Sequence, residues 1–318
     1  MAFITPAADR TAPDHFEWQY LDLMHRIWTA GDERHDRTGV GTRSLFGETL
    51  RFDLADGAMP LITTKRVFWK TATRELLWFL TGETNIRPLV QQGVAIWTDW
   101  PLARYRRETA HDITKDDFVS RIIDDVEFAR RWGDLGPVYG RQWVNWPSFV
   151  ATGDGLYRKG EGINQIAKLV EGLRKDPYGR RHILEGWNVA ELDAMALPPC
   201  HKTYQFHVAA GRLNSLLSQR SCDVALGLPF NLWSAALLQR MIAAQVGLKP
   251  GIFMWVGGDT HLYLNHDRLV EEQLRRQPDG HPRLTINSEV DDIFAYSLQD
   301  FTVHDYAPQP QITAPVAV

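Results

Sequence analysis

The sequence contains two cysteines, and their surroundings differ. Cys200 follows a pair of prolines, which cannot continue a β-ladder and would hold it in an irregular, accessible position. Cys222 lies between Ser221 and Asp223 in an alternating segment, where a free cysteine is most often a small buried hydrophobe. Because the thiolate is the nucleophilic form of cysteine, we expect Cys200 to be a nucleophile and Cys222 to be a core residue.

The alternating segments on either side of Ala210-Gly211 predict a β-hairpin. With the turn centred there, antiparallel pairing places Cys200 opposite Ser221 and His201 opposite Arg220, within one residue of slippage. A guanidinium beside the sulfur favours the thiolate. His201 points to the opposite face of the strand from its neighbour, so we interpret it as structural rather than as the general base.

Glu75 lies in a predicted helix, residues 71–80, that is apolar on most sides and therefore buried. Burial of an ionised carboxylate is costly unless the group is partnered, hydrated or protonated. A solvent-facing glutamate paired with Arg74 is the alternative, and the apolar surroundings disfavour it. This carboxyl group is therefore a candidate for acid or base chemistry.

The composition is that of a globular protein with a core of its own: 318 residues, 44% hydrophobic and 23% charged. The formal net charge of −4 provides no overall field that would attract nucleic acid or an anionic membrane. Two cysteines in so long a chain indicate a reducing compartment. The first residues lack a signal-peptide pattern, and no stretch reaches the ~18 apolar residues of a membrane span. We therefore expect a cytoplasmic protein.

The elements that must position these residues alternate between helix and strand. Residues 1–15 predict a flexible N-terminal arm, and residues 16–318 predict a single catalytic domain, since no repeat or linker interrupts them. A charged stretch from about 103 to 132 predicts a helical surface insertion. The pattern predicts helices at 16–28, 71–80, 163–173 and 231–245, and strands at 45–52, 202–208, 213–224 and 253–264.

Five motifs resemble those of the thymidylate synthase family in their order and spacing: Leu197-Pro-Pro-Cys-His201, Gln219-Arg-Ser-Cys-Asp-Val224, Leu226-Gly-Leu-Pro-Phe-Asn231, Gly258-Asp-Thr-His-Leu-Tyr263 and Ala314-Pro-Val-Ala-Val318. The likeness runs from about Phe16 to the last residue. It implies an α/β fold of the α+β type: one domain with a large mixed β-sheet flanked by helices, the sheet face packed in a homodimer. It also implies reductive methylation of dUMP to dTMP, with 5,10-methylenetetrahydrofolate as the one-carbon and hydride donor and dihydrofolate as the second product.

The resemblance also implies catalytic roles. Cys200 would add to C6 of uracil, which turns C5 into a nucleophile. Glu75 would organise water for proton transfers around O4, and Tyr139 would assist removal of the C5 proton. The implied catalytic set is Cys200, Glu75, Tyr139, Arg220, Asn231 and Asp223.

The dUMP ligands implied by the resemblance suit a nucleotide monophosphate. Guanidinium groups with a hydroxyl suit the phosphate, and Arg180 and Arg181 match a pair that reaches over from the other subunit. Asn231 can donate to O4 and accept from N3–H of uracil, although a helix-cap role is the alternative. The implied set is Arg37, Arg180, Arg181, Arg220, Ser221, Asp223, Asn231, His261 and Tyr263. The last two share one face of a strand and would hold the ribose 3′-hydroxyl.

The folate site implied by the resemblance is largely apolar, and the last residues of the chain would close over the ligands and exclude water. The implied residues are Ile96, Trp97, Trp100, Leu197, Asp223, Leu226, Gly227, Phe230 and Ala317. Some positions depart from the family pattern. Phe68 and Thr71 replace a histidine or arginine and a serine, Thr98 replaces an aspartate, and Glu185-Gly186 replaces a Ser-Ala pair.

Three other functions are alternatives. A dUMP hydroxymethylase of the same fold would quench the methylene intermediate with water, whereas Trp97 and the intact C-terminal motif favour hydride transfer. A catalytically idle nucleotide- or RNA-binding protein would not need every nucleophile and acid/base position. A zinc hydrolase would use Asp259, His261 and His266, but no cysteine or carboxylate cluster lies near them, so we expect no metal.

Overall fold

The computed structural model describes residues 4–35 and 39–315. The chain divides into two compact units. The first consists of the described residues of Met1–Ala72 and Tyr204–Ala317, and the second is Thr73–Thr203. No helix in the described ranges is long and apolar enough to cross a membrane.

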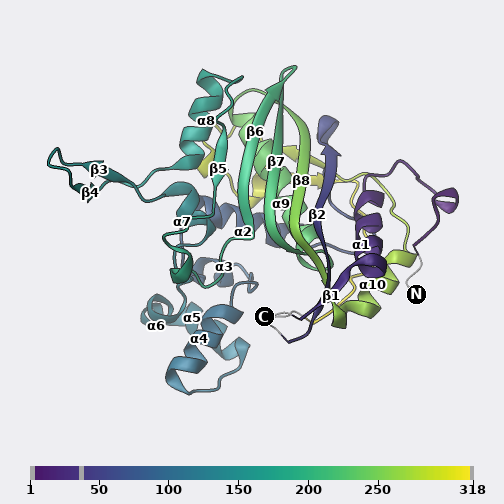
Figure 1. The fold of residues 1–318 in the computed structure, drawn as a ribbon, viewed down its shortest axis with the longest axis horizontal. Helices are drawn as coiled ribbons and strands as arrows, with labels where there is room; N and C mark the ends of the chain where they lie inside the picture. The colour runs from purple at the N-terminus through teal and green to yellow at the C-terminus, as the bar shows by residue number, and fades with distance from the viewer. Residues whose placement is uncertain (1–3, 36–38, 316–318) are drawn as a thin grey trace. The chain divides into compact units, whose positions relative to one another are not determined.

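The main sheet has six strands in the described part of the chain, in the order β1-β2-β8-β7-β6-β5 (Figure 1). β7 runs parallel to β8, whereas β2 pairs antiparallel with both β1 and β8, so the sheet is mixed. The strands are β1 (Asp32–Arg34), β2 (Thr42–Asp53), β5 (Ile183–Glu185), β6 (His201–Ala209), β7 (Arg212–Asp223) and β8 (Lys249–Tyr263). The prediction of a large mixed sheet flanked by helices is confirmed.

Helix α9 (Gly227–Gln245) covers one face of β7 and β8 (Figure 1). The alternating burial along β7 places Ser215 and Leu217 on the α9 side, where Ser215 donates a hydrogen bond to Gln239 of α9 at 2.5 Å. α9 is apolar nearly all round, as expected of a helix with other elements on several sides. Helix α1 (Trp18–Ala30) packs against β2 and α10 (Asp267–Arg275).

Most predicted elements coincide with observed ones. The helix predicted at 71–80 lies in α2 (Trp69–Thr81), and the one at 163–173 overlaps α8 (Gln165–Lys175). The hairpin turn is also present: Ala210 and Gly211 both have positive φ values, 49° and 70°, which is the backbone geometry of a type I′ turn. α9 begins four residues earlier than predicted, because Pro229 fits into the first turn of a helix, where its missing N–H is not needed.

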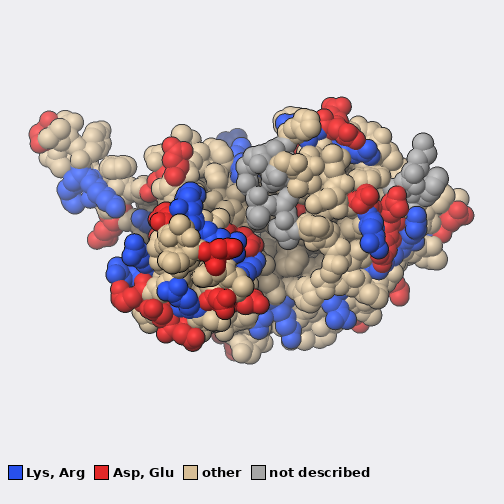
Figure 2. Space-filling view, turned by 90° about the horizontal axis from the view of Figure 1, so that it is seen from below, with Lys and Arg blue, Asp and Glu red and all other residues tan. Residues whose placement is uncertain are grey.

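The second unit is mainly helical. Its helices are most of α2, then α3 (Arg87–Gln91), α4 (Asp99–Thr109), α5 (Lys115–Asp124), α6 (Val126–Trp132), α7 (Tyr139–Val144) and α8. Four buried rings from α4, α5 and α6 pack together, with centroids 5.1–5.8 Å apart: Tyr105, Phe118, Phe128 and Trp132. These helices cover most of the charged stretch 103–132, and Figure 2 shows acidic and basic side chains interspersed on their surface.

Two small antiparallel strand pairs and one contact of the N-terminal segment lie outside the main sheet. A hairpin of β3 (Phe149–Ala151) and β4 (Tyr157–Lys159) extends away from α7 and α8 (Figure 1). In the first unit, β9 (Arg283–Ile286) pairs with β10 (Phe301–His304). In the N-terminal segment, Arg10 lies 4.1 Å from the Trp18 ring of α1.

Candidate active site

Cys200 lies directly before β6 and is half-buried, whereas Cys222 lies in β7 and is 2% exposed. This is the difference in environment that the sequence predicted. The backbone N–H of Cys200 donates a hydrogen bond to the Tyr139 hydroxyl at 2.6 Å. The segment that carries the thiol is therefore held by the first residue of α7.

Tyr139 lies in a cluster of rings at the start of α7. Its ring centroid is 4.9 Å from that of Phe79 and 5.5 Å from that of His201. A Cβ atom on Gly140 would lie 2.5 Å from the Phe79 carbonyl oxygen, so glycine lets α7 approach α2 this closely. Burial, together with the charges of Cys200 and Glu75, raises the pKa of Tyr139 well above its usual value, which keeps the phenol protonated.

Glu75 lies in α2 and is half-buried as a residue, while its carboxyl group is enclosed by protein atoms. Burial raises the pKa of Glu75 from 4.5 to about 7, although the Trp97 indole donates a hydrogen bond to Oε1 at 2.7 Å and acts in the opposite direction. The predicted need for a partner is thus met by Trp97. A carboxyl group with this pKa can both give and accept a proton near neutral pH.

Among the expected folate residues of the second unit, Trp97 contacts this carboxyl group and Trp100 packs on Trp97. The rings of Trp97 and Trp100 are 5.3 Å apart, and Trp97 also contacts Tyr139 at 6.0 Å. Ile96 is 39% exposed, and Leu197 is half-buried. The second unit therefore combines an indole wall with the carboxyl, phenol and thiol groups.

In the first unit, Asn231 lies inside α9, so the helix-cap interpretation of this residue is wrong. Its Oδ1 accepts a hydrogen bond from Gln219 Nε2 at 2.9 Å, and Gln219 Oε1 in turn accepts one from the Trp255 indole at 2.8 Å. This chain of bonds fixes the orientation of the Asn231 amide. Sequence reasoning did not identify Gln219, although it lies in the same motif as Cys222 and on the inward face of β7.

Asp223 shapes the turn between β7 and α9. Its Oδ1 accepts hydrogen bonds from the backbone N–H groups of Ala225 at 2.9 Å and Leu226 at 3.1 Å. The buried Lys65 ammonium donates to the carbonyl oxygen of Ala225, and burial lowers the pKa of Lys65 to about 8. Gly227 opens α9 directly after this turn, and Phe230 follows in its first turn.

His261 and Tyr263 lie on β8 with their rings 5.3 Å apart, so they share a face as predicted. His261 Nδ1 lies 3.0 Å from Asp259 Oδ1, and Arg34 donates to the other oxygen of Asp259 at 2.9 Å. The hydrogen bond with His261, together with the charge of Arg34, holds the pKa of Asp259 below its usual value. Asp259 therefore orients the His261 ring, and the alternation of β8 is the signal that could have placed it beside this ring.

Within residues 4–35 and 39–315, no three His, Cys, Asp or Glu side chains form a group that could hold a metal ion. His266 Nε2 lies 2.9 Å from the carbonyl oxygen of Pro315. In this structure Asp259, His261 and His266 are therefore not grouped as the ligands of one metal ion would be.

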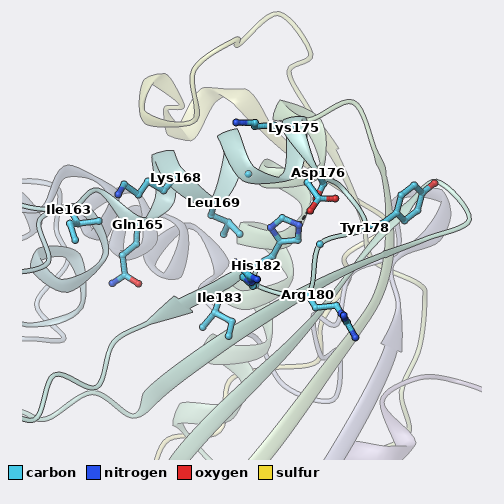
Figure 3. A pocket seen from close by; sticks show the side chains of 13 residues that line it. Ile163, Gln165, Lys168, Leu169, Lys175, Asp176, Tyr178, Arg180, His182 and Ile183 are labelled. Carbon is cyan, nitrogen blue, oxygen red and sulfur yellow. Dashed lines mark hydrogen bonds between the residues drawn. The ribbon is translucent and has the colours of Figure 1, made fainter.

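Arg180 and Arg181 are exposed in the segment that connects α8 to β5. This segment borders a cavity of about 750 Å³ whose other wall is α8 (Figure 3). His182 turns inward and lies 2.8 Å from the carbonyl oxygen of Asp176, and Arg180 points away from His182 (Figure 3).

Two groups of predicted residues thus assemble, one in each unit. Arg220 and Ser221 are half-buried near the end of β7 in the first unit. The predicted pairing of Cys200 with Ser221, and of His201 with Arg220, involves both units and stays a prediction. Arg37 and Ala317 lie outside the described residues.

Comparisons with known proteins identify the class of the molecule. The family model described as thymidylate synthase matches residues 18–318. A thymidylate synthase of Novosphingobium aromaticivorans is 68% identical over 310 residues, which are 97% of this chain and 99% of the relative. One of Sphingopyxis alaskensis is 64% identical over 306 residues, 96% of this chain and 98% of the relative. A thymidylate synthase of Rhizorhabdus wittichii is 60% identical over 306 residues, which are 96% of this chain and 99% of the relative.

These comparisons show that the protein is an enzyme of the methyltransferase class. More specifically, the chain belongs to the thymidylate synthase family.

Proposed function

We propose that the protein converts dUMP to dTMP with 5,10-methylenetetrahydrofolate, through a covalent adduct of Cys200 with C6 of uracil. The observation that carries this proposal is the cluster in the second unit. This cluster contains the half-buried Cys200, Tyr139, which is hydrogen-bonded to the backbone of Cys200, and the enclosed Glu75 carboxyl group, whose pKa is about 7. A thiol can serve as the nucleophile for covalent addition to a pyrimidine, and a carboxyl group and a phenol can assist the proton transfers.

The first step is attack of the Cys200 thiolate on C6. The electron pair of the C5–C6 bond moves toward O4 and forms an enolate, whose C5 is then the nucleophile. Glu75 would stabilise O4 through a proton, directly or by way of water, since its carboxyl group is partly protonated at neutral pH. The folate supplies the one-carbon unit and then the hydride.

Tyr139 assists the next proton transfer. After C5 has formed its new bond, its proton must leave before the thiol can be eliminated. The phenol stays protonated and bonds to the Cys200 backbone, so it acts by orienting an acceptor such as water rather than as a free phenolate. After the folate nitrogen has left the new methylene carbon and that carbon has received the hydride, loss of Cys200 from C6 would restore the ring double bond.

We propose that the first unit supplies the uracil and ribose ligands. The Asn231 amide, fixed by Gln219, would bond O4 and N3–H, and His261 with Tyr263 would bond the ribose 3′-hydroxyl. Asp223 would support both substrates through the turn it shapes. The proposed phosphate ligands are Arg37, Arg220 and Ser221.

We propose a folate site with two kinds of wall. The paired indoles of Trp97 and Trp100 fit a flat aromatic ring, because offset or tilted aromatic contacts stabilise such pairs. Ile96 and Leu197 add aliphatic surface from the same unit. The first unit would contribute Asp223, Leu226, Gly227 and Phe230, with Ala317 closing the site.

We propose a homodimer in which Arg180 and Arg181 bind the phosphate in the partner's site. The exposure of both side chains supports this arrangement. So does the second face of the main sheet, where Leu216, Met254 and Val256 are half-buried rather than covered by α9. We further propose that the enzyme is cytoplasmic and uses no metal.

The test is a spectrophotometric assay with dUMP and methylenetetrahydrofolate that follows dihydrofolate, combined with the product mass. A methyl product with equimolar dihydrofolate supports the proposal. A hydroxymethyl product without dihydrofolate would show the hydroxymethylase activity, which the names of the relatives do not favour. Capture of 5-fluoro-dUMP on a peptide that contains Cys200 would establish the covalent step, and absence of that adduct would contradict it.

A further inference from the structure

Glu185 ends β5, and both its backbone and its side chain are bonded to other elements of the second unit. Its N–H donates to Gln165 Oε1 at 3.0 Å, and its carbonyl oxygen accepts from Gln165 Nε2 at 2.9 Å. Gln165 Nε2 also donates to the carbonyl oxygen of Gln142 in α7 at 2.8 Å. The backbone of Glu185 is therefore tied to α8 and, through Gln165, to α7.

The Glu185 carboxylate joins two further segments. Oε1 accepts a hydrogen bond from the backbone N–H of Trp187 at 2.9 Å, and Oε2 accepts one from the Thr203 hydroxyl at 2.6 Å. Thr203 is three residues after Cys200, in β6. Each oxygen of this carboxylate therefore holds a different part of the chain.

The segment after Glu185 runs close to the segment that contains the thiol. The N–H of Gly186 donates to the carbonyl oxygen of Lys202 at 2.8 Å. A Cβ atom at position 186 would lie 3.0 Å from the carbonyl oxygen of His201 and 3.6 Å from Cβ of Pro199. A contact at 3.0 Å is tight, so glycine lets the two segments approach without displacement.

These bonds form a closed circuit that begins and ends in α7. From Tyr139 it passes to the Cys200 backbone, along the chain to Thr203, and across to Glu185. It then returns through Gln165 to α7. Cys200 lies inside this circuit, with one anchor directly on its N–H and a second anchor three residues away.

We infer that Glu185 is a positioning residue, which together with Thr203 holds Cys200 at the reacting carbon. This inference rests on the proposed function, because it assumes that Cys200 is the nucleophile. The two carboxylate oxygens bond to Trp187 and Thr203, so the carboxylate acts on Cys200 through the backbone. This role also accounts for Glu185 in place of the serine of the family pattern, because a serine side chain is too short to reach both Trp187 and Thr203.

The geometry predicts that loss of the hydrogen bond between Glu185 and Thr203 affects catalysis more than substrate binding. Small displacements of a nucleophile reduce the rate of reaction while leaving the other substrate contacts in place. We therefore expect Glu185→Ala and Thr203→Val each to lower kcat about tenfold, the size expected for one charge-assisted hydrogen bond, with KM for dUMP unchanged within about twofold. The double variant should lose no more than Glu185→Ala alone, because both changes break the same bond.

The conservative variant Glu185→Gln should rescue most of the activity. Its amide oxygen can accept from Trp187, and its amide nitrogen can donate to the Thr203 hydroxyl. The matched control is Thr152→Val, which also removes a hydroxyl that donates to a carboxylate, here that of Asp154 at the tip of the β3–β4 hairpin. This control should leave kcat unchanged.

Backbone amide exchange measures the positioning itself, without any substrate. In Glu185→Ala and Thr203→Val, the amides from Cys200 to Thr203 should exchange about tenfold faster, and Glu185→Gln should return them to wild-type rates. If the wild type forms no dihydrofolate, the proposed function fails and amide exchange alone decides the inference. The inference is overturned if these exchange rates stay unchanged in both variants, or if Glu185→Gln loses as much activity as Glu185→Ala. Should Glu185→Ala fail to fold, Thr203→Val decides the question.

Discussion

Replacement of Glu75 by glutamine should stabilise the protein in a manner that depends on pH. The pKa of Glu75 is raised from 4.5 to about 7 in the folded state by burial. Between these two values the folded chain holds a proton that the unfolded chain has lost. By linkage, the free energy of unfolding therefore falls as the pH rises through this interval, and the full penalty is present above about pH 7.

The size of this penalty follows from the shift. A change from 4.5 to about 7 corresponds to about 3 kcal/mol at 1.36 kcal/mol for each pKa unit. Glu75→Gln removes the titration, and its amide oxygen can still accept the Trp97 indole bond. Relative to wild type, the variant should gain nothing near pH 4 and up to about 3 kcal/mol at pH 8. The same substitution, Glu75→Gln, should lower kcat by about two orders of magnitude, because the proton donor is lost.

Urea denaturation at pH 5, 6, 7 and 8 measures this difference, at one fixed protein concentration and without ligands. Glu83→Gln is the control, since Glu83 is exposed two residues after α2 and no comparable pH dependence is expected. A difference between Glu75→Gln and wild type that stays constant from pH 5 to pH 8 would refute the assignment of an enclosed, proton-holding carboxyl group.

Three further changes test other parts of the site. Tyr139→Phe removes the acceptor for the Cys200 backbone N–H and should lower release of tritium from C5 of dUMP about a hundredfold; unchanged release would remove Tyr139 from the mechanism. Asn231→Asp should shift the preference from dUMP toward dCMP, read as the ratio of kcat/KM values, and an unaltered ratio would contradict base recognition by this amide. Gly140→Ala should cost about 1 to 3 kcal/mol in urea denaturation, because its Cβ would lie 2.5 Å from the Phe79 carbonyl oxygen; a variant of full stability would show that α7 and α2 can separate freely.

The strands and helices around the site follow from local patterns. The positive φ values of Ala210 and Gly211 agree with a turn that short-range chemistry predicts, and α2 agrees with its apolar run to within two residues. The start of α9 does not, because Pro229 is compatible both with a lead-in segment and with the first turn of a helix. Local sequence cannot separate these two cases.

The partners of the site residues depend on distant parts of the chain, which explains why the sequence does not reveal them. The oddity of a glutamate in an apolar helix is visible at Glu75, but its partner Trp97 is 22 residues away. In the same way, Asn231 is recognisable from its motif, whereas the bond from Gln219 that fixes its amide arises only when α9 lies on β7. Family resemblance predicts which residues act on substrates, and the fold shows which residues hold those side chains in place.

The four packed rings of α4, α5 and α6 give this region an apolar interior of its own, independent of the cluster around Tyr139. A segment that fills itself in this way can be lengthened, shortened or exchanged during evolution with little effect on the elements that carry the chemistry. Variation in chain length among related enzymes can therefore accumulate here, and the same property makes the outer surface of these helices a suitable place to attach a spectroscopic label.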